Sequence, residues 1–586
     1  MSRVKQKKIA PLTFRMFEHK IYFKYCRKEA CFADLEEQEM LKGKRTIHIS
    51  VWILAVLLST MQTVGCRISV FYHTSVHRTL LPILEKLSET GWLVWWLIEF
   101  VVLGIGFEFL FYALENAGRK NAEAASREKK SFKKKALFIF IGLIICWLPV
   151  LFANYPGFFN YDILGQLPQV MYQEVSYDTH HSLLSTLVMG GVITCGYHLF
   201  GTLTGGVCLH SCFQMALCAG TFTYTIWFIQ KRTARKWIII CAFAFYALSP
   251  TIAMFTISTT KDVVCSLLLL IAVLQSYEMF EDPDLFFSKK LQPISLCICL
   301  VSGALYRKNV IYAVLFFTIL CIFICRKKRA LILAVFGSSV LLTLLASAGM
   351  ENALHAQKGS IVEAFCIPIQ QVARVYQEQG EEAFTSEDLD LIDAAISKEF
   401  QGNYNPFLAD DVKNYTSGQV IMADSAAYLS LWLHKGLQNP GTYVKAFLDN
   451  TYQAWYPGTS IVDNLQGEIY YFDFNGRNYL PTSTISPTLT HFYRKISLES
   501  FYQKLPVIRL LFSIGAMFWV AVITFFYGIR MKQPKIWQTW LFVFALCLTV
   551  FLGPISLVRY YLILFYILPV SILLLFGATE QTQRKG

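Results

Sequence analysis

The feature that most constrains this chain is a long series of apolar runs, most of them about as long as a helix that crosses a membrane. A helix needs about 20 predominantly apolar residues to cross a hydrocarbon core of about 30 Å. We therefore predict an all-α, polytopic membrane protein with about twelve transmembrane helices. The predicted spans are residues 48–66, 92–114, 136–153, 206–229, 237–255, 263–279, 292–306, 309–325, 330–349, 507–528, 537–555 and 559–577.

Composition agrees with a chain that lies in a bilayer and excludes several other classes. Charged residues make up only 16% of the sequence, whereas soluble domains carry about 25%. The net charge of +13 comes from short basic blocks beside apolar runs, the pattern that orients helices in membranes. We therefore expect the lipid bilayer as a partner and no nucleic acid. The 16 cysteines lie mostly inside apolar runs, which predicts small buried side chains and no disulfide framework.

Basic segments predict which side of the membrane each loop faces. By the positive-inside rule they should be cytoplasmic, which places both termini on the cytoplasmic side of the cell membrane, and the N-terminal segment is too long and polar to be a cleavable signal peptide. The apolar segment 183–201 is the exception, because counting it as a span would place the basic segment 231–236 outside. We predict that 183–201 lies along or dips into the outer face; the alternative is a different number of spans. The segments used are 1–47, 118–135, 231–236, 326–329, 530–535 and 578–586.

The order of apolar and polar segments predicts a domain organisation. The large polar insert is acidic where the cytoplasmic loops are basic, so we expect it outside the cell as an α-rich cap. Within it, Thr385 or Ser386 should cap a helix, and 468–474 has the pattern of a strand. The expected parts are a cytoplasmic segment 1–47, two additional spans with a basic loop at 48–135, a membrane core at 136–349, the cap at 350–505, C-terminal helices at 506–577 and a cytoplasmic tail at 578–586.

Polar clusters stand at the predicted outer ends of four spans, where ionisable residues are costly and most often functional. The first lies in the loop 154–181, which carries more large and titratable side chains than a simple connector requires. Each cluster also has a structural explanation, because Lys261 and Arg307 can extend to lipid headgroups and Tyr560 can belong to an aromatic belt. The clusters are Asp162 with His180 and His181, Lys261 with Asp262, Arg307 with Asn309, and Arg559 with Tyr560.

The order of these motifs resembles the GT-C superfamily, polytopic glycosyltransferases that use polyprenyl-phosphate-linked sugars. The segment "HHSLL…LFG" (180–201) is similar to the "HPPL…LFG" of protein mannosyltransferases, and "TKDV" (260–263), "RKN" (307–309) and "RY" (559–560) follow it. The closest resemblance is to a group of uncharacterised bacterial GT-C-like membrane proteins, which "PIQQVARVY" (368–376) and "NTYQAWYP" (450–457) also resemble. The resemblance covers roughly residues 136 to 577.

This sequence departs from the mannosyltransferase pattern in three places. Ile163 follows Asp162 where those enzymes have a second acidic residue, "HHSLL" replaces a double proline, and two additional spans precede the core. These differences bear on the sugar and the acceptor more than on the reaction class. The resemblance therefore implies transfer of a sugar from a polyprenyl-phosphate donor to a cell-wall polymer, glycolipid or protein on the outer face of the membrane, usually with inversion.

The chemistry of that reaction assigns an expected role to each cluster. Asp162 resembles the family's catalytic aspartate and would be the general base, with a pKa that desolvation can raise toward neutrality. Arginine's planar fork suits phosphate, so Arg559, with Tyr560 beside it, is the first candidate for the donor phosphate, and Arg307 and Lys261 are the second. The residues expected near sugar or acceptor are Asp262, Asn309, His180, His181, Gln370, Gln371 and Arg374.

Several alternatives remain open from the residues alone. His180 and His181 could bind a divalent metal with Asp162 or Asp178, although adjacent helical residues point about 100° apart and rarely serve one ion. The residues 370–374 could equally lie on an amphipathic helix that packs on the membrane core. At the level of the whole protein, the alternatives are a transporter, a flippase or polymerase of surface polysaccharide, and a non-catalytic scaffold.

Overall fold

The computed structural model describes residues 48–72, 87–122, 133–233, 235–359, 361–458, 485–497, 505 and 507–577. The chain divides into two compact units, Met1–Ile53 and Leu54–Gly586. The predicted strand at 468–474 and the cytoplasmic segments 1–47 and 578–586 lie outside the described residues. Within the described residues every regular element is a helix, and strand pairing is limited to isolated bridges. The prediction of an all-α chain is confirmed for this part of the sequence.

Nine helices in the described ranges are long and apolar enough to cross a membrane. They are α2 (Ile49–Phe71), α4 (Glu89–Ala122), α5 (Lys133–Ala153), α7 (Leu183–Phe200), α8 (Leu203–Gln230), α11 (Lys261–Glu281), α15 (Arg329–Ala353), α24 (Pro534–Phe551) and α25 (Leu562–Gly577) with the short η9 (Val558–Tyr561) before it. Four further apolar helices are shorter: α9 (Lys236–Leu248), α13 (Leu291–Tyr306), α14 (Asn309–Ile324) and α23 (Ile514–Arg530).

Each of the twelve predicted spans falls on one of these apolar helices, but two predictions need a correction. The expected span 507–528 begins with the short η8 (Ile508–Phe512), and α23 starts only at Ile514, after Ser513 in an extended conformation (ψ 123°). The expected continuous span 237–255 is broken, because α9 ends at Leu248 and a separate helix α10 (Pro250–Phe255) follows. Proline lacks the backbone N–H that a continuous helix needs, and it forces the preceding residue into an extended conformation. Ser249 accordingly has ψ 118°.

The segment 183–201 forms α7, which turns back at Gly201 (φ +70°) into α8. The two helices approach closely where Gly196 faces Gly206, since a Cβ on Gly196 would lie 2.7 Å from the Cα of Gly206. In length and composition α7 is able to cross a membrane. Its position on the outer face therefore stays a prediction.

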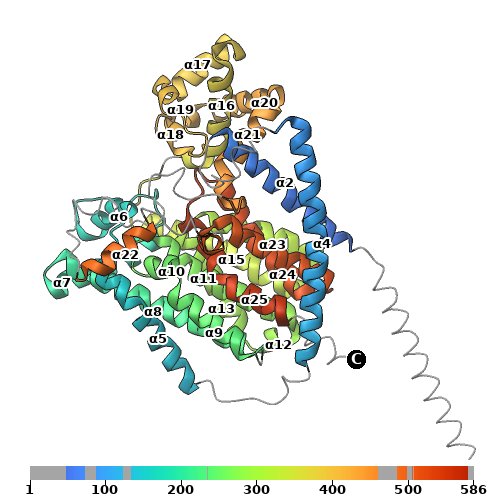
Figure 1. Ribbon diagram of the computed structural model, residues 1–586. Helices are drawn as coiled ribbons and strands as arrows, with labels where there is room; N and C mark the ends of the chain where they lie inside the picture. The colour runs from blue at the N-terminus through green and yellow to red at the C-terminus, as the bar shows by residue number, and fades with distance from the viewer. Residues whose placement is uncertain are drawn as a thin grey trace, which may run out of the picture. The chain divides into compact units, whose positions relative to one another are not determined.

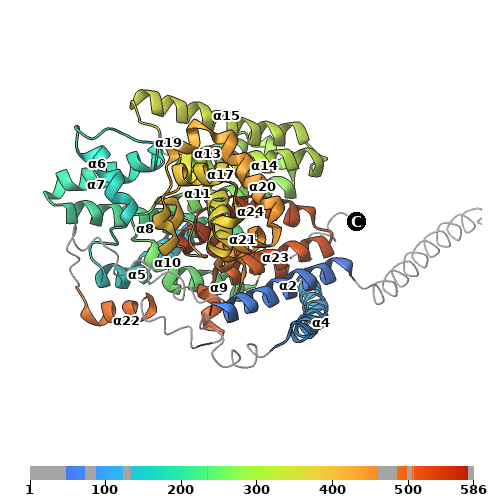
Figure 2. The ribbon, with the colours of Figure 1, turned by 90° about the horizontal axis from the view of Figure 1, so that it is seen from above.

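Helix α11 is the centre of the membrane-type bundle. Of its apolar window 72% is buried, against 83% for η9 with α25 and 22% for α4, which indicates that α11 and α25 are inner helices and α4 is a peripheral one. Helices α8, α13, α24 and α25 pack directly on α11. Figure 2 shows α11 among α8, α13 and α24, with α15 farther out. The two ends of α11 consequently become the natural places for polar groups from several neighbours to meet.

Residues 361–455, here called the helical insert, form a separate group of short helices. In Figure 1 the helices α16 to α20 gather beyond one end of the bundle. Hydrogen bonds tie the insert to the chain before η9, since Ala409 N donates to Pro554 O at 2.9 Å and the side-chain Nδ2 of Asn450 donates to Gly553 O at 3.1 Å. The elements are η3 (Ile361–Phe365), α16 (Cys366–Gln379), η4 (Glu381–Ala383), α17 (Ser386–Ala395), η5 (Lys398–Gly402), α18 (Asp410–Lys413), α19 (Gly418–Ala423), α20 (Ser425–Gln438) and α21 (Pro440–Trp455).

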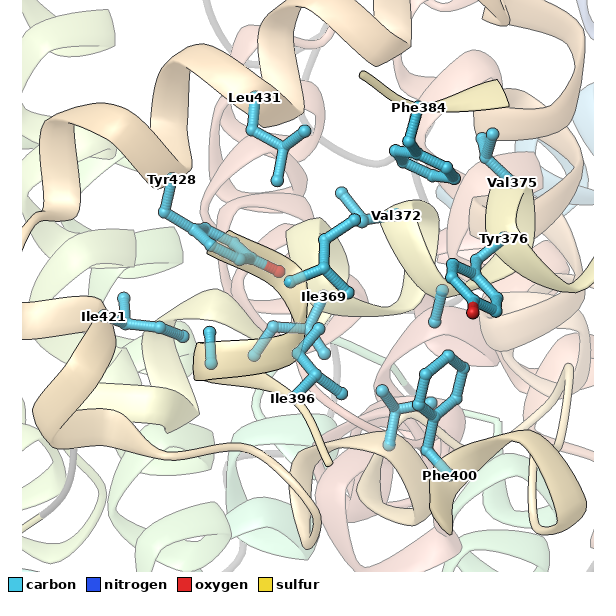
Figure 3. Packing of buried hydrophobic residues seen from close by; sticks show 14 of the residues in the cluster. Ile369, Val372, Val375, Tyr376, Phe384, Ile396, Phe400, Ile421, Tyr428 and Leu431 are labelled. Carbon is cyan, nitrogen blue, oxygen red and sulfur yellow. The ribbon is translucent and has the colours of Figure 1, made fainter. Parts of the chain in front are cut away.

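The insert has its own apolar core, shown in Figure 3, in which Ile369, Val372 and Tyr428 are buried together with their neighbours. Thr385 caps α17 through a reciprocal pair of hydrogen bonds with Asp388, as the sequence predicts. A core of this kind lets the insert fold as a compact body. The remaining described helices are α6 (Tyr161–Met171), α12 (Pro283–Ser288), α22 (Pro487–Ser497) and η8 (Ile508–Phe512).

Candidate functional site

The segment before α6 is fixed against the segment before α11, and this brings two distant parts of the sequence together. Phe158 N donates to Ile257 O at 2.9 Å and Thr259 N donates to Phe158 O at 3.0 Å. Asn160 N donates to the hydroxyl of Thr259 at 2.8 Å. Asp162, in the first turn of α6, therefore lies beside Lys261, the first residue of α11.

Gly157 makes this close approach possible. Its φ of +140° is rarely adopted by other residues, and a Cβ there would meet Ser211 Oγ and lie 2.8 Å from Ile257 O. Gln214 of α8 holds the other side, because its buried Nε2 donates to the carbonyls of Phe255, Thr256 and Ser258 at 2.8 to 3.1 Å. The turn before α11 is thus held by side chains of α8 as well as by its own backbone.

Five charged side chains meet at this place. Arg559 Nη1 donates to Asp162 Oδ2 at 2.8 Å, and Lys261 Nζ lies 3.9 Å from the same oxygen. Arg307 forms an ion pair with Asp262, whose other oxygen is 3.8 Å from Arg559 Nε. The carboxylates and Arg559 are at most 7% exposed, while Lys261 and Arg307 are 17% and 15% exposed. Three cations face two carboxylates, which leaves one formal positive charge in a nearly dry cluster.

A cavity opens from one edge of this cluster. It encloses about 430 Å³ of empty space, its mouth included, and its polar end is formed by Asp262, Arg307, Asn309 and Tyr560. Its other walls are mainly apolar side chains of α11, α14, α24 and the start of α25, with a few small polar ones. The α11 residues that line it lie on one helix face over about 10 Å of helix: Asp262, Cys265, Ser266 and Leu269. Only about 30 Å³ of this space is wide enough for the centre of a water molecule, so the structure shows a narrow cleft. Its lining, charged at one end and mostly apolar beyond it, matches an amphipathic lipid in polarity.

The ring of His181 lies against the ammonium group of Lys261. Its Nδ1 lies 3.0 Å from Lys261 Nζ, and burial together with the Lys261 charge lowers the pKa of His181 to about 3. A neutral ring therefore accepts from the ammonium group, while the neighbouring His180 is exposed. In the described parts of the chain no group of three or more His, Cys, Asp or Glu side chains is arranged to hold a metal ion.

The expected pKa of Asp162 is wrong in direction. Burial by itself would raise the pKa, but Arg559, Lys261 and His181 outweigh burial and lower the pKa of Asp162 to about 2. The expected rise in pKa took only desolvation into account, whereas Arg559 at 2.8 Å strongly favours the charged form of Asp162. Asp162 is consequently ionised at any physiological pH, and its ion pair keeps it a weak base.

The guanidinium of Arg559 is already surrounded by protein groups, which weakens its assignment as the first phosphate ligand. Nη1 faces Asp162, Nη2 donates to the Tyr560 hydroxyl at 3.0 Å, and Nε faces Asp262. Arg307, which was only a second choice, lines the cavity, and Arg559 is absent from its lining. The cavity therefore favours Arg307 as the arginine that a ligand in it would contact.

Three predicted residues of the insert are not brought to this cluster. Gln370 donates to Asn405 O at 2.8 Å, and Gln371 donates to Tyr443 O at 3.2 Å. Arg374 donates to Glu378 at 2.7 Å and to the Tyr72 hydroxyl at 2.9 Å. All three are buried. The partners of Gln370 and Gln371 belong to the insert, so these two side chains pack inside it, and the alternative of a helix face packed on the membrane core stays a prediction.

Sequence reasoning missed three groups that build the site. Thr260 caps α11 and donates to Asp262 at 2.9 Å; a threonine just before an acidic first turn is a cap signal that could have revealed it. Gln214 carried no such signal, because an amide inside an apolar run does not indicate which carbonyls it will meet. Lys308 donates to Thr179 O and so joins the α13–α14 turn to the loop before α7.

The fold and the site define an all-helical protein with apolar helices of membrane-spanning length and a buried charged cluster at one end of the bundle. The chain belongs to DUF6020, a family of unknown function, whose model matches residues 172–586. Asp162 and the segment that positions it precede the matched residues. No curated protein and no solved structure matches the chain.

Proposed function

We propose that this protein is a GT-C-like membrane glycosyltransferase that moves a sugar from a polyprenyl-phosphate donor to a cell-envelope acceptor on the outer face of the membrane. The observation that carries the proposal is the meeting of Asp162, Lys261, Asp262, Arg307 and Arg559 beside a mostly apolar cavity. The finer architecture, with about twelve spans and the insert as an extracytoplasmic cap, is part of the same proposal.

The proposed reaction assigns each end of the cavity a part of the donor. The polyprenyl chain lies along the apolar walls, and its phosphate lies near Arg307, Asn309 and Tyr560 at the polar end. An acceptor hydroxyl attacks the anomeric carbon, the bond from that carbon to the phosphate oxygen breaks, and the phosphate leaves with the electron pair. The hydroxyl proton passes to Asp162 as the new bond forms. This step requires that substrate binding first separates Asp162 from Arg559 (2.8 Å) and brings it to the cavity, because the paired carboxylate is a weak base and does not line the cavity. Inversion follows from attack opposite the leaving group.

Electrostatics supports a phosphate at this place. The cluster carries one surplus positive charge, and charge-assisted bonds from arginine to phosphate are about twice as strong as neutral hydrogen bonds. The low exposure of the cluster strengthens such interactions further, because little water competes for the charges. A departing phosphate monoester would find these cations already in place, which is the arrangement that lowers a charge-separating barrier.

The test compares envelope glycans by mass spectrometry in cells without the protein and in cells that produce it as wild type or as Asp162→Asn. We expect one glycan signal to depend on the wild type and to be lost in Asp162→Asn, by about 100-fold or more in transfer rate. Glu281→Gln is the matched control, since Glu281 is also paired with an arginine (2.7 Å) and a lysine (3.0 Å) but at the far end of α11.

Two results would contradict the proposal. If Asp162→Asn supports the same glycan as the wild type while both are produced in equal amounts, the enzymatic reading fails and a scaffold is favoured. If no glycan changes when the protein is removed, while movement of a lipid-linked sugar across the membrane does, a flippase or transporter is favoured instead.

A further inference from the structure

At the polar end of the cavity, Arg307 is already paired with an anionic side chain of the protein, Asp262. The guanidinium forms an ion pair with Asp262, and both side chains line the cavity. A phosphate that enters the cavity therefore reaches Arg307 beside the Asp262 carboxylate, which takes the Nη1 donor. Two anions cannot both accept from the same edge of one guanidinium group.

Asp262 has other partners that would keep it in place without Arg307. It lies in the first turn of α11, where the helix dipole favours negative charge. The Thr260 hydroxyl donates to Asp262 Oδ2 at 2.9 Å, and Arg559 Nε lies 3.8 Å from the same oxygen. The carboxylate can therefore release Arg307 and remain solvated by the protein.

Arg307 likewise has a support that does not depend on Asp262. Its guanidinium carbon lies 4.0 Å from the centre of the Tyr560 ring, a distance typical of a cation–π contact. A contact of this kind does not use up the N–H donors of the guanidinium, which can still exchange hydrogen-bond partners. Arg307 therefore stays at the cavity while its hydrogen-bond partner changes.

We propose that Asp262 is an internal competitor of the donor phosphate: it neutralises Arg307 in the empty site and yields it when the phosphate of a polyprenyl-phosphate lipid binds. This inference rests on the proposed function and adds a role to the same site. The carboxylate keeps the empty cluster from holding two uncompensated charges in a dry place, which would be strongly destabilising. It also lowers the affinity for the phosphate, so that product lipid phosphate can leave after transfer.

The experiment measures binding of farnesyl phosphate, a short polyprenyl phosphate, to the full-length protein in detergent micelles by equilibrium dialysis. Asp262→Asn keeps the shape and an acceptor for Thr260 but removes the competing charge, so it should bind the probe about ten-fold tighter than the wild type. Glu281→Gln, the same kind of change at the other end of α11, should bind it as the wild type does. Farnesol, which lacks the phosphate, should bind equally to all three proteins.

A double variant separates local competition from a general change of charge. If Asp262 acts through Arg307, the gain from Asp262→Asn should disappear in an Arg307→Met background. Persistence of the gain there, weaker or unchanged binding of farnesyl phosphate to Asp262→Asn, or failure of the wild type to bind the probe would each overturn the inference. Asp262→Ser replaces Asp262→Asn if the latter does not fold. Since the probe carries no sugar, these outcomes are independent of whether transfer is ever detected.

Discussion

At the residue scale, the direction in which a buried acid responds to its surroundings depends on its neighbours. Asp162 and Asp449 are both nearly fully buried, yet their pKa values move in opposite directions. Arg559 and Lys261 lower the pKa of Asp162 to about 2. Burial raises the pKa of Asp449 to about 6, because its hydrogen bond from Tyr72 (2.7 Å) and its arginine at 3.5 Å compensate only in part.

The shift of Asp449 predicts how stability depends on pH. An aspartate with a raised pKa in the folded state keeps its proton to a higher pH than the unfolded chain does, so stability falls as pH rises from about 4 to about 6 and is constant above that. The groups that face Asp449 are Tyr72, Arg374, Glu378 and Lys445. Removing the charge with Asp449→Asn should recover up to about 3 kcal/mol above pH 7.

The measurement is thermal unfolding of the wild type and Asp449→Asn in detergent between pH 4 and pH 8. We expect the wild type to lose stability over this range more steeply than the variant, with the two curves closest at the acid end. Equal slopes for both proteins, or a variant that is less stable at pH 8, would contradict the assignment.

At the element scale, the site depends on how one irregular segment is held between helices. Residues 154–160, which precede Asp162, are not helical. Their contacts with Ile257, Thr259 and Ser211 fix this segment and so position Asp162. Sequence patterns predicted where the neighbouring helices lie, because apolar runs of that length are unambiguous. They missed the break between α9 and α10 at Pro250, since the run remains apolar across the proline.

Gly157 is the element-scale position that a single methyl group should disturb. Gly157→Ala would strain a backbone with φ +140° and place a Cβ against Ser211 and Ile257 O, so we expect a loss of about 2 kcal/mol or more in the free energy of unfolding. Gly220→Ala in α8 is the control, because no atom lies within 4 Å of its added Cβ and alanine favours a helix by up to about 1 kcal/mol.

Chemical or thermal unfolding of both variants in detergent checks this expectation. A Gly157→Ala protein as stable as Gly220→Ala would show that the segment adapts easily, and the argument that this turn positions Asp162 would then be wrong.

At the scale of the whole molecule, polar groups separate to the two ends of α11. The site cluster surrounds its first residues, while Glu281 at its last turn pairs with Arg232 and Lys535, which belong to two of the basic segments predicted to be cytoplasmic. Lys328 of a third basic segment pairs with Asp284 just beyond. The grouping of three basic segments agrees with a shared side of the membrane, and their cytoplasmic position stays a prediction.

Epitope tags decide the topology and the position of α7 together. With α7 on the outer face, a tag within 231–236 should be inaccessible to antibody in intact cells, and a tag in the insert at 402–403 should be accessible. If α7 crosses the membrane, one more crossing precedes both tags, so each tag lies on the opposite side and both results are reversed. Permeabilised cells, in which both tags should react, provide the control for tag production.

From the sequence alone follow the helical character of the described residues, the location of the apolar helices and the polar groups at their ends, because length and apolarity are local properties of a run. Which of those groups meet depends on the tertiary fold. Asp162 and Arg559 are 397 residues apart, and no local pattern records that they share a hydrogen bond. Partners of this kind arise from how helices pack around α11, and they set the charge state and the orientation of every group in the site.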